Sequence, residues 1–174
     1  MRIEIGQFII RDWRQGDADA LVRYADNLKI AANLRDGFPS PYTRSDAESF
    51  LRSVTANTPH TVFAIATEAE AIGCIGLMLG QDVHRLTAEL GYWLAEPYWG
   101  QGIMTSAVIA VTDLGFQDFG LNRIHAEPYA SNRASARVLE KARFRFEGRL
   151  RASVVKNGKV LDQCVYAKVR DGIT

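Results

Sequence analysis

The sequence has few of the residues that mark disulfide-rich and metal-binding proteins. Its 174 residues include two cysteines and three histidines. Cys74 and Cys164 lie far apart, so we expect two reduced structural thiols rather than a disulfide framework. His60, His84 and His125 include no pair at the spacing of metal ligands, which argues against a metal site.

An excess of one charge and a long apolar run are also missing. The chain has 21 basic and 20 acidic residues, a formal net charge of +1, so no global field favours nucleic acid or an anionic membrane. No apolar run is long enough to span a bilayer, and the N-terminus lacks the charged-then-apolar pattern of a signal peptide. We therefore expect a cytoplasmic protein whose partners are neither nucleic acids nor membranes.

No repeat, low-complexity tract or Ser/Gly-rich linker divides the chain, so we expect a single domain over residues 1–174. The first part predicts a strand at 3–13, a helix at 14–29 and a loop at 33–43. Ser45 followed by Glu48 has the spelling of a capping box, which predicts a helix from there to about Val54.

The remainder alternates between strand and helix periodicity. It predicts strands at 61–67, 71–79, 87–95 and 122–130, helices at 103–119 and 131–144, and a terminal hairpin that turns at Asn157-Gly158. The expected fold class is α/β in the mixed α+β sense, with antiparallel hairpins flanking one β-α-β crossover.

The run "WGQGIM" at 99–104 places two glycines directly before a helix, where unpaired backbone N–H groups can hold phosphate. A dinucleotide fingerprint would need a third glycine where Thr105 stands, and a P-loop would need a lysine after Gly102. A plain helix start, with glycines for tight packing, accounts for these residues equally well. The local spelling alone leaves the choice open.

Two longer motifs decide the interpretation. "AELGYWLAEPYWGQGIMTSAV" followed by "NRIHAEPYASNRASARVLEKARF" resembles the GNAT superfamily of acyl-CoA-dependent N-acyltransferases, in its RimJ/RimL-type branch. The resemblance covers nearly the whole chain. It implies one GNAT-like domain with a mixed, mostly antiparallel central sheet of about seven strands, splayed in the middle and with helices on both faces.

The resemblance also implies acetyl-CoA as co-substrate and no metal. Its pyrophosphate loop falls on residues 99–104, where Trp99 and Met104 depart from the general consensus. Arg143 stands where the second motif usually has glycine, and Leu139 stands where many members have a tyrosine that protonates the leaving thiolate. The implied cofactor-binding residues are Tyr92, Trp93, Leu94, Trp99, Gly100, Gln101, Gly102, Ile103, Met104, Thr105, Asn132 and Ser135.

Glu89 is the candidate catalytic base, because it lies in the strand that leads to the glycine loop and family members place a glutamate here. Burial in a central strand would raise its pKa, which suits a base. Ser135, or a water that it holds, is the candidate acid, and a backbone N–H of residues 92–94 is the candidate oxyanion donor. Phe38 and Tyr42 are implied to border the acceptor.

The acceptor itself stays open at this stage. A protein N-terminal α-amine is favoured over a polyamine, amino acid or aminoglycoside, because the acceptor loop has Asp36 as its one carboxylate. A non-catalytic acyl-CoA sensor is the second class, and a nicotinamide-dependent oxidoreductase the third. Family members are often dimers, so a homodimer is a further expectation.

Glu89→Gln tests the catalytic interpretation. We expect it to lower the rate of acetyl transfer mainly below neutral pH, where most of the amine is protonated and needs a base, while CoA binding is kept. The measurement is a pH–rate profile beside a CoA titration. An unchanged profile would remove Glu89 as the base.

Overall fold

The computed structural model describes residues 1–173, and its eight strands form one sheet in the order β1-β2-β3-β4-β5-β6-β8-β7. The pairing is antiparallel for most neighbours and parallel for β5 with β6, which confirms the mixed, mostly antiparallel sheet. The eighth strand arises because the expected strand at 3–13 is a hairpin. Its strands are β1 (Arg2–Ile5) and β2 (Phe8–Arg11), and Gly6 turns between them at φ 71°.

The contacts divide the chain into two compact units. The first comprises residues 1–76 and 92–103, and the second comprises residues 77–91 and 104–173. Strands β4 (Ala71–Leu79) and β5 (Thr87–Leu94) supply residues to both units. The single domain over 1–174 stays a prediction.

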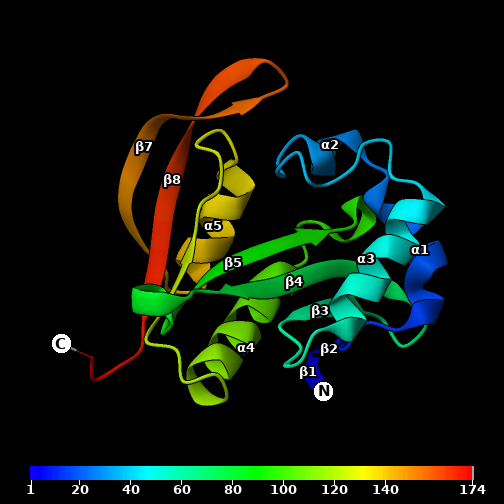
Figure 1. Cartoon of the computed structure of the whole chain (residues 1–174), viewed down its shortest axis with the longest axis horizontal. Helices are drawn as coiled ribbons and strands as arrows, with labels where there is room; N and C mark the ends of the chain where they lie inside the picture. The colour runs from blue at the N-terminus through cyan, green and yellow to red at the C-terminus, as the bar shows by residue number, and fades with distance from the viewer. Residues whose placement is uncertain (174) are drawn as a thin grey trace. The chain divides into compact units, whose positions relative to one another are not determined.

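The first unit is built on helices α1 (Ala18–Ala25) and α3 (Arg44–Ala56), which lie side by side in Figure 1. Leu21 of α1 and Leu51 of α3 are buried in a core shared with Ala64 of strand β3 (Val62–Ala66). Sequestering these apolar side chains is the main stabilising contribution to the unit. Trp13 closes the core at one side, with its ring edge-on to Phe50 at 5.2 Å between centroids.

Two local predictions in this unit are wrong, and polar side chains explain both. The expected helix at 14–29 consists of η1 (Gln15–Asp17), α1 and α2 (Leu28–Ala31), because Asn27 accepts the N–H of Lys29 and starts a new helix. The capping box of α3 is formed by Thr43 and Asp46, not by Ser45 and Glu48. The same spelling occurs two residues earlier with aspartate in the third helical position.

The second unit holds the crossover and the terminal hairpin. Its elements are η2 (Asp82–His84), α4 (Ile103–Gln117, whose first residue belongs to the first unit), β6 (Arg123–Ala126), α5 (Arg133–Lys141), β7 (Arg145–Lys156) and β8 (Lys159–Val169). Ala107 and Val111, one helical turn apart on α4, are fully buried. A Cβ at Gly115 would lie 2.8 Å from Ile124 Cδ1, so glycine lets α4 approach β6 closely.

The terminal hairpin confirms its predicted turn. Asn157 and Gly158 have φ values of 52° and 73°, the left-handed pair that a type I′ turn needs. β7 and β8 then run as the long twisted ribbon drawn from orange to red in Figure 1.

Arg143 carries backbone strain at the end of α5. It has φ 66°, and the N–H of Phe144 returns to the Leu139 carbonyl at 2.9 Å, as in a glycine-type helix cap. The left-handed conformation costs a residue other than glycine roughly 1–2 kcal/mol relative to the right-handed one. The family's usual glycine at this position therefore has a physical reason, and this chain departs from it.

We expect Arg143→Gly to raise the free energy of unfolding by roughly 0.5–1 kcal/mol, because relieved strain exceeds the added freedom of the unfolded chain. Arg137→Gly, inside the same helix and also exposed, is the matched control and should lower it by roughly 0.5–1 kcal/mol. Denaturant titration of the three proteins measures both changes. A destabilised Arg143→Gly would contradict the strain argument.

Candidate functional site

The glycine loop of the first unit is held by its own side chains. The indole N–H of Trp99 donates to the Leu94 carbonyl at 2.7 Å, and the amide of Gln101 donates to the Pro97 carbonyl at 3.2 Å. These contacts close the short turn η3 (Glu96–Tyr98) beneath the loop. Trp99, a departure from the family consensus, thus anchors the loop.

Gly100 and Gly102 have φ values of 77° and 80°, and no heavy atom lies within 4 Å of a Cβ built at either position. Backbone conformation, not packing, therefore requires glycine here. Both residues are exposed, and the chain continues from Gly102 directly into α4. An exposed pair of left-handed glycines before a helix fits a cradle of backbone N–H groups for phosphate.

The next residues divide into core and surface. Ile103 and Met104 are buried, with 4% and 7% of their surface exposed, so their side chains are core residues and only their backbone N–H groups suit a ligand. Thr105 is half-buried. Upstream, Leu94 is buried while Tyr92 and Trp93 are half-buried.

Glu96 ties the start of this loop to α2. Its carboxylate accepts a hydrogen bond from the Asn27 amide at 2.8 Å and forms an ion pair with Lys29. These hydrogen bonds, that from Lys29 first, lower the pKa of the Glu96 carboxyl. The sequence did not predict these contacts, because Glu96 is 69 positions from Asn27 and 67 positions from Lys29.

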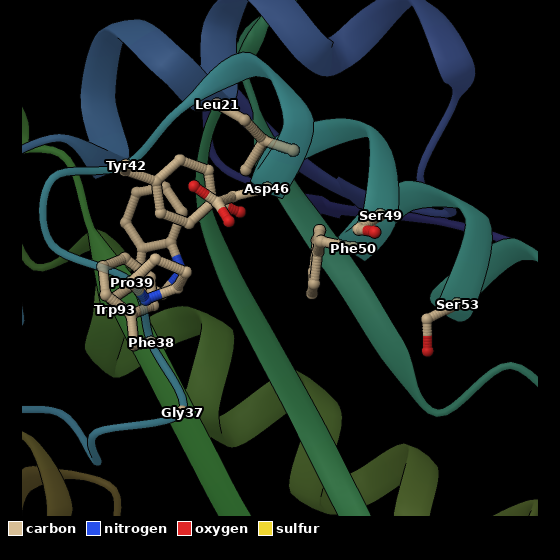
Figure 2. A pocket seen from close by; sticks show the side chains of 10 residues that line it. All are labelled: Leu21, Gly37, Phe38, Pro39, Tyr42, Asp46, Ser49, Phe50, Ser53 and Trp93. Carbon is tan, nitrogen blue, oxygen red and sulfur yellow. The ribbon is translucent and has the colours of Figure 1, made fainter.

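A pocket of about 380 Å³ lies in the first unit (Figure 2). Its walls come from the loop before α3, from α3 itself, from α1 and from β5. The lining residues are Leu21, Gly37, Phe38, Pro39, Tyr42, Asp46, Ser49, Phe50, Ser53 and Trp93. The two predicted acceptor residues, Phe38 and Tyr42, thus line one cavity together with Trp93.

The rings at one end of the pocket contact one another. Phe38 lies 5.1 Å from Tyr42 and 6.1 Å from Trp93 between ring centroids. Burial raises the pKa of Tyr42 to about 12, so its phenol stays neutral at physiological pH. The Tyr42 N–H donates to the Asp26 carboxylate at 3.0 Å, which fixes the loop before α3.

In the second unit, Glu89 lies where two parallel strands stop pairing. β5 and β6 share three residue pairs, Thr87–Arg123, Ala88–Ile124 and Glu89–His125, and the last of these ends the ladder. Glu89 and His125 are therefore direct neighbours across the sheet, and both are half-buried.

His125 is a residue that sequence reasoning set aside. Its Nδ1 is buried without a hydrogen-bond partner among the described residues, and its Nε2 lies 3.8 Å from Glu127 Oε1. A buried nitrogen without a partner is unusual in folded proteins. The sequence placed His125 in a predicted strand, but it gave no sign that this strand would pair His125 with Glu89.

Asn132 and Ser135 lie at the start of α5, as predicted. The Asn132 side chain accepts the Ser135 N–H at 3.1 Å and caps the helix. Asn132 therefore has a structural role, whatever it binds. Ser135 is half-buried, and Leu139 is fully buried.

No group of three or more His, Cys, Asp or Glu side chains among residues 1–173 is placed to hold a metal ion. In the same range, none of the helices combines the length and apolar character needed for a membrane span.

The sequence matches the acetyltransferase (GNAT) domain over residues 7–145, which is most of its length. The chain belongs to the GNAT family. Among its GNAT relatives is the uncharacterized N-acetyltransferase YoaA of Bacillus subtilis (strain 168), 38% identical over 58% of this chain and 56% of that protein. The chain thus spans about half the length of YoaA.

Two further similar proteins match this chain over a larger share of both sequences. The putative ribosomal N-acetyltransferase YdaF of Bacillus subtilis (strain 168) is 33% identical over 84% of this chain and 75% of that protein. The solved structure of Mycobacterium smegmatis RimJ in complex with CoA-disulfide superposes with a TM-score of 0.84 at 25% identity, over 95% of this chain and 83% of that one. The GNAT fold expected from the motifs is confirmed.

The buried nitrogen of His125 leads to a stability prediction. His125→Leu removes a buried polar atom that has no partner among residues 1–173, so we expect the free energy of unfolding to rise by roughly 1 kcal/mol. The exposed His84 supplies the control, since His84→Leu should change stability by less than about 0.5 kcal/mol. Denaturant titration compares them. A clear loss of stability in His125→Leu would mean that Nδ1 has a partner in solution.

Proposed function

We propose that this protein is an N-acetyltransferase that moves an acetyl group from acetyl-CoA to a primary amine. The favoured acceptor is a protein N-terminal α-amine, attacked directly in a ternary complex. The observation that carries the proposal is the pair of exposed glycines at positive φ, Gly100 and Gly102, in a loop that runs into α4. Such a loop binds phosphate through backbone N–H groups and needs no charged side chain.

CoA suits this loop better than the nucleotides considered above. Thr105 is not the third glycine of a dinucleotide fingerprint, and the chain belongs to the acetyltransferase (GNAT) family, whose resemblance implies acetyl-CoA as co-substrate. In the proposal, the N–H groups of residues 100–104 hold the pyrophosphate of CoA, and the partial positive charge of the helix start adds to the attraction. Asn132 and Ser135 are assigned to the pantetheine arm by the family motif.

Glu89 is the proposed base. It takes a proton from the substrate ammonium, and the neutral amine then attacks the thioester carbonyl. The new C–N bond forms first and gives a tetrahedral oxyanion, whose C–S bond then breaks as the carbonyl returns. The amine's second proton is lost as the amide forms and, through Ser135 or a water that it holds, reaches the leaving thiolate. A backbone N–H of residues 92–94 is assigned to the oxyanion.

The leaving thiolate needs little assistance, because an unperturbed thiol has a pKa of about 8.5. Leu139 is fully buried and apolar, so it cannot replace the tyrosine acid of other members. Ser135, or a water that it holds, stays the proposed proton donor. Cys74 is not proposed as a nucleophile, since burial raises the pKa of its thiol to about 12 and a nucleophile needs the thiolate.

The acceptor assignment draws on the name of one relative and on the aromatic pocket. YdaF is named as a putative ribosomal N-acetyltransferase, which favours a protein amine. Phe38 and Tyr42 are assigned to the acceptor because they line the pocket of the first unit. A cytoplasmic location and a homodimer stay predictions.

Acetyl-CoA binding and thiol release test the proposal together. We expect the protein to bind acetyl-CoA in calorimetry and to release free thiol when peptides with varied N-termini or small amines are added. Gly102→Ala should weaken acetyl-CoA binding about tenfold. Alanine disfavours the positive φ of this position, so the free loop adopts another conformation and binding has to restore the original one.

Gly16→Ala is the control for this variant. Gly16 is exposed, has equally open space around its Cβ and lacks a positive φ, so its replacement should leave acetyl-CoA binding unchanged. If the protein binds acetyl-CoA but releases no thiol with any amine of the panel, the transferase proposal is rejected and a non-catalytic acyl-CoA sensor is favoured. Binding of NADH with no affinity for acetyl-CoA would reject the family-based function.

A further inference from the structure

The pocket of the first unit has the chemistry of a site for an apolar side chain. Six of its lining residues are apolar or aromatic, namely Leu21, Phe38, Pro39, Tyr42, Phe50 and Trp93. Leu21 and Tyr42 are nearly inaccessible in the fold, so the walls rest on the core and do not collapse inward. In Figure 2 the rings of Phe38, Tyr42 and Trp93 gather at one end, while α3 carries Phe50 along the other.

Asp46 is the one carboxylate in the lining, and helix capping accounts for it. Its Oδ2 accepts the N–H of Thr43 at 2.8 Å and the hydroxyl of Thr43 at 2.5 Å. These bonds lower the pKa of the Asp46 carboxyl, and the positive end of α3 also compensates its charge. The Asp46 carboxylate therefore stays ionised at neutral pH and serves the start of α3, while six apolar and aromatic residues make up most of the pocket lining.

Ser49 and Ser53 supply a polar margin. Both belong to α3, one turn apart, and both are exposed. These two serines are accessible to solvent, whereas the aromatic residues that line the pocket are half-buried or buried. An apolar base with a narrow polar margin is the usual composition of a small-molecule or side-chain pocket.

The size of the pocket favours a large occupant over a small one. A methyl group is about as large as a water molecule, whose share of liquid volume is roughly 30 Å³. Around the side chain of alanine or serine, most of the open cavity of about 380 Å³ would stay filled with water. A phenyl or branched aliphatic side chain would remove far more aromatic surface from water, and it would gain edge-to-face contacts with the rings.

We propose that this pocket selects acceptors by the side chain next to the reactive amine, and that it takes a bulky apolar or aromatic side chain such as phenylalanine or leucine. The inference rests on the proposed function, because it names the substrate class of the proposed acceptor site. It extends that function, since the residues of α3 that line the pocket were absent from every prediction made from the sequence.

Peptides that differ only in their first residue test the selection. The probes begin with phenylalanine, leucine, alanine or lysine, and the measurements are Kd by calorimetry and kcat/KM by thiol release. We expect the phenylalanine and leucine peptides to bind at least ten times more tightly than the alanine peptide, the discrimination typical of apolar pockets. The lysine peptide should bind no better than the alanine peptide.

A filled pocket supplies the structural test. Ser49→Phe places a ring in the cavity and should reduce the preference for phenylalanine over alanine to less than about threefold. Glu48→Phe is the matched control, because Glu48 is exposed on the same helix and does not line the pocket, so the preference should persist. Ser53→Phe repeats the test at a second exposed position, and thermal unfolding verifies that each variant is folded.

Three results would overturn the inference: equal binding of the alanine and phenylalanine peptides, tighter binding of the lysine peptide, or an unchanged preference in both filled variants. The calorimetry separates this inference from the proposed function. Selective binding without thiol release would reject the transferase and keep the pocket assignment. Thiol release without selectivity would do the reverse.

Discussion

The parallel pairing of β5 with β6 ends after three residue pairs, and the candidate chemistry of the second unit depends on where it ends. A longer ladder would place Glu89 in the middle of a continuous sheet. Ending at Glu89 and His125 leaves two titratable side chains side by side on the last pair, one with a buried nitrogen that no described residue satisfies. Unsatisfied buried polar groups reduce stability, so a fold that keeps one here retains it at a cost that a functional role would explain.

In the first unit the comparable constraint is the positive φ of Gly100 and Gly102. Trp99 and Gln101 close the loop from within, and Glu96 ties its start to α2 through Asn27 and Lys29. The loop is therefore held in shape before any ligand arrives, which reduces the ordering that binding requires. Two departures from the family consensus have local reasons, because Trp99 anchors the loop and Met104 is a core residue. Nothing in the structure explains the third, Arg143, which is strained where glycine would not be.

Much of the fold was predictable because hydrophobic periodicity and turn residues are local. The turn at Asn157-Gly158 and the helices at 103–119 and 131–144 were readable in this way. The errors arose where two local signals compete. Thr43–Asp46 and Ser45–Glu48 offer rival capping boxes, and Asn27 interrupts a helical pattern that periodicity alone would continue. Only the energy of the packed structure chooses between such alternatives.

The sequence by itself determined the family, the glycine loop and the candidate base, because backbone conformation and motif spacing are properties of neighbouring residues. Tertiary structure alone decided which distant side chains meet. It paired Glu89 with His125, tied Glu96 to Asn27, and joined Phe38, Tyr42 and Trp93 with the face of α3 around one pocket. Contacts of this kind depend on how strands pair and helices pack over tens of residues, and no short stretch of sequence contains that information.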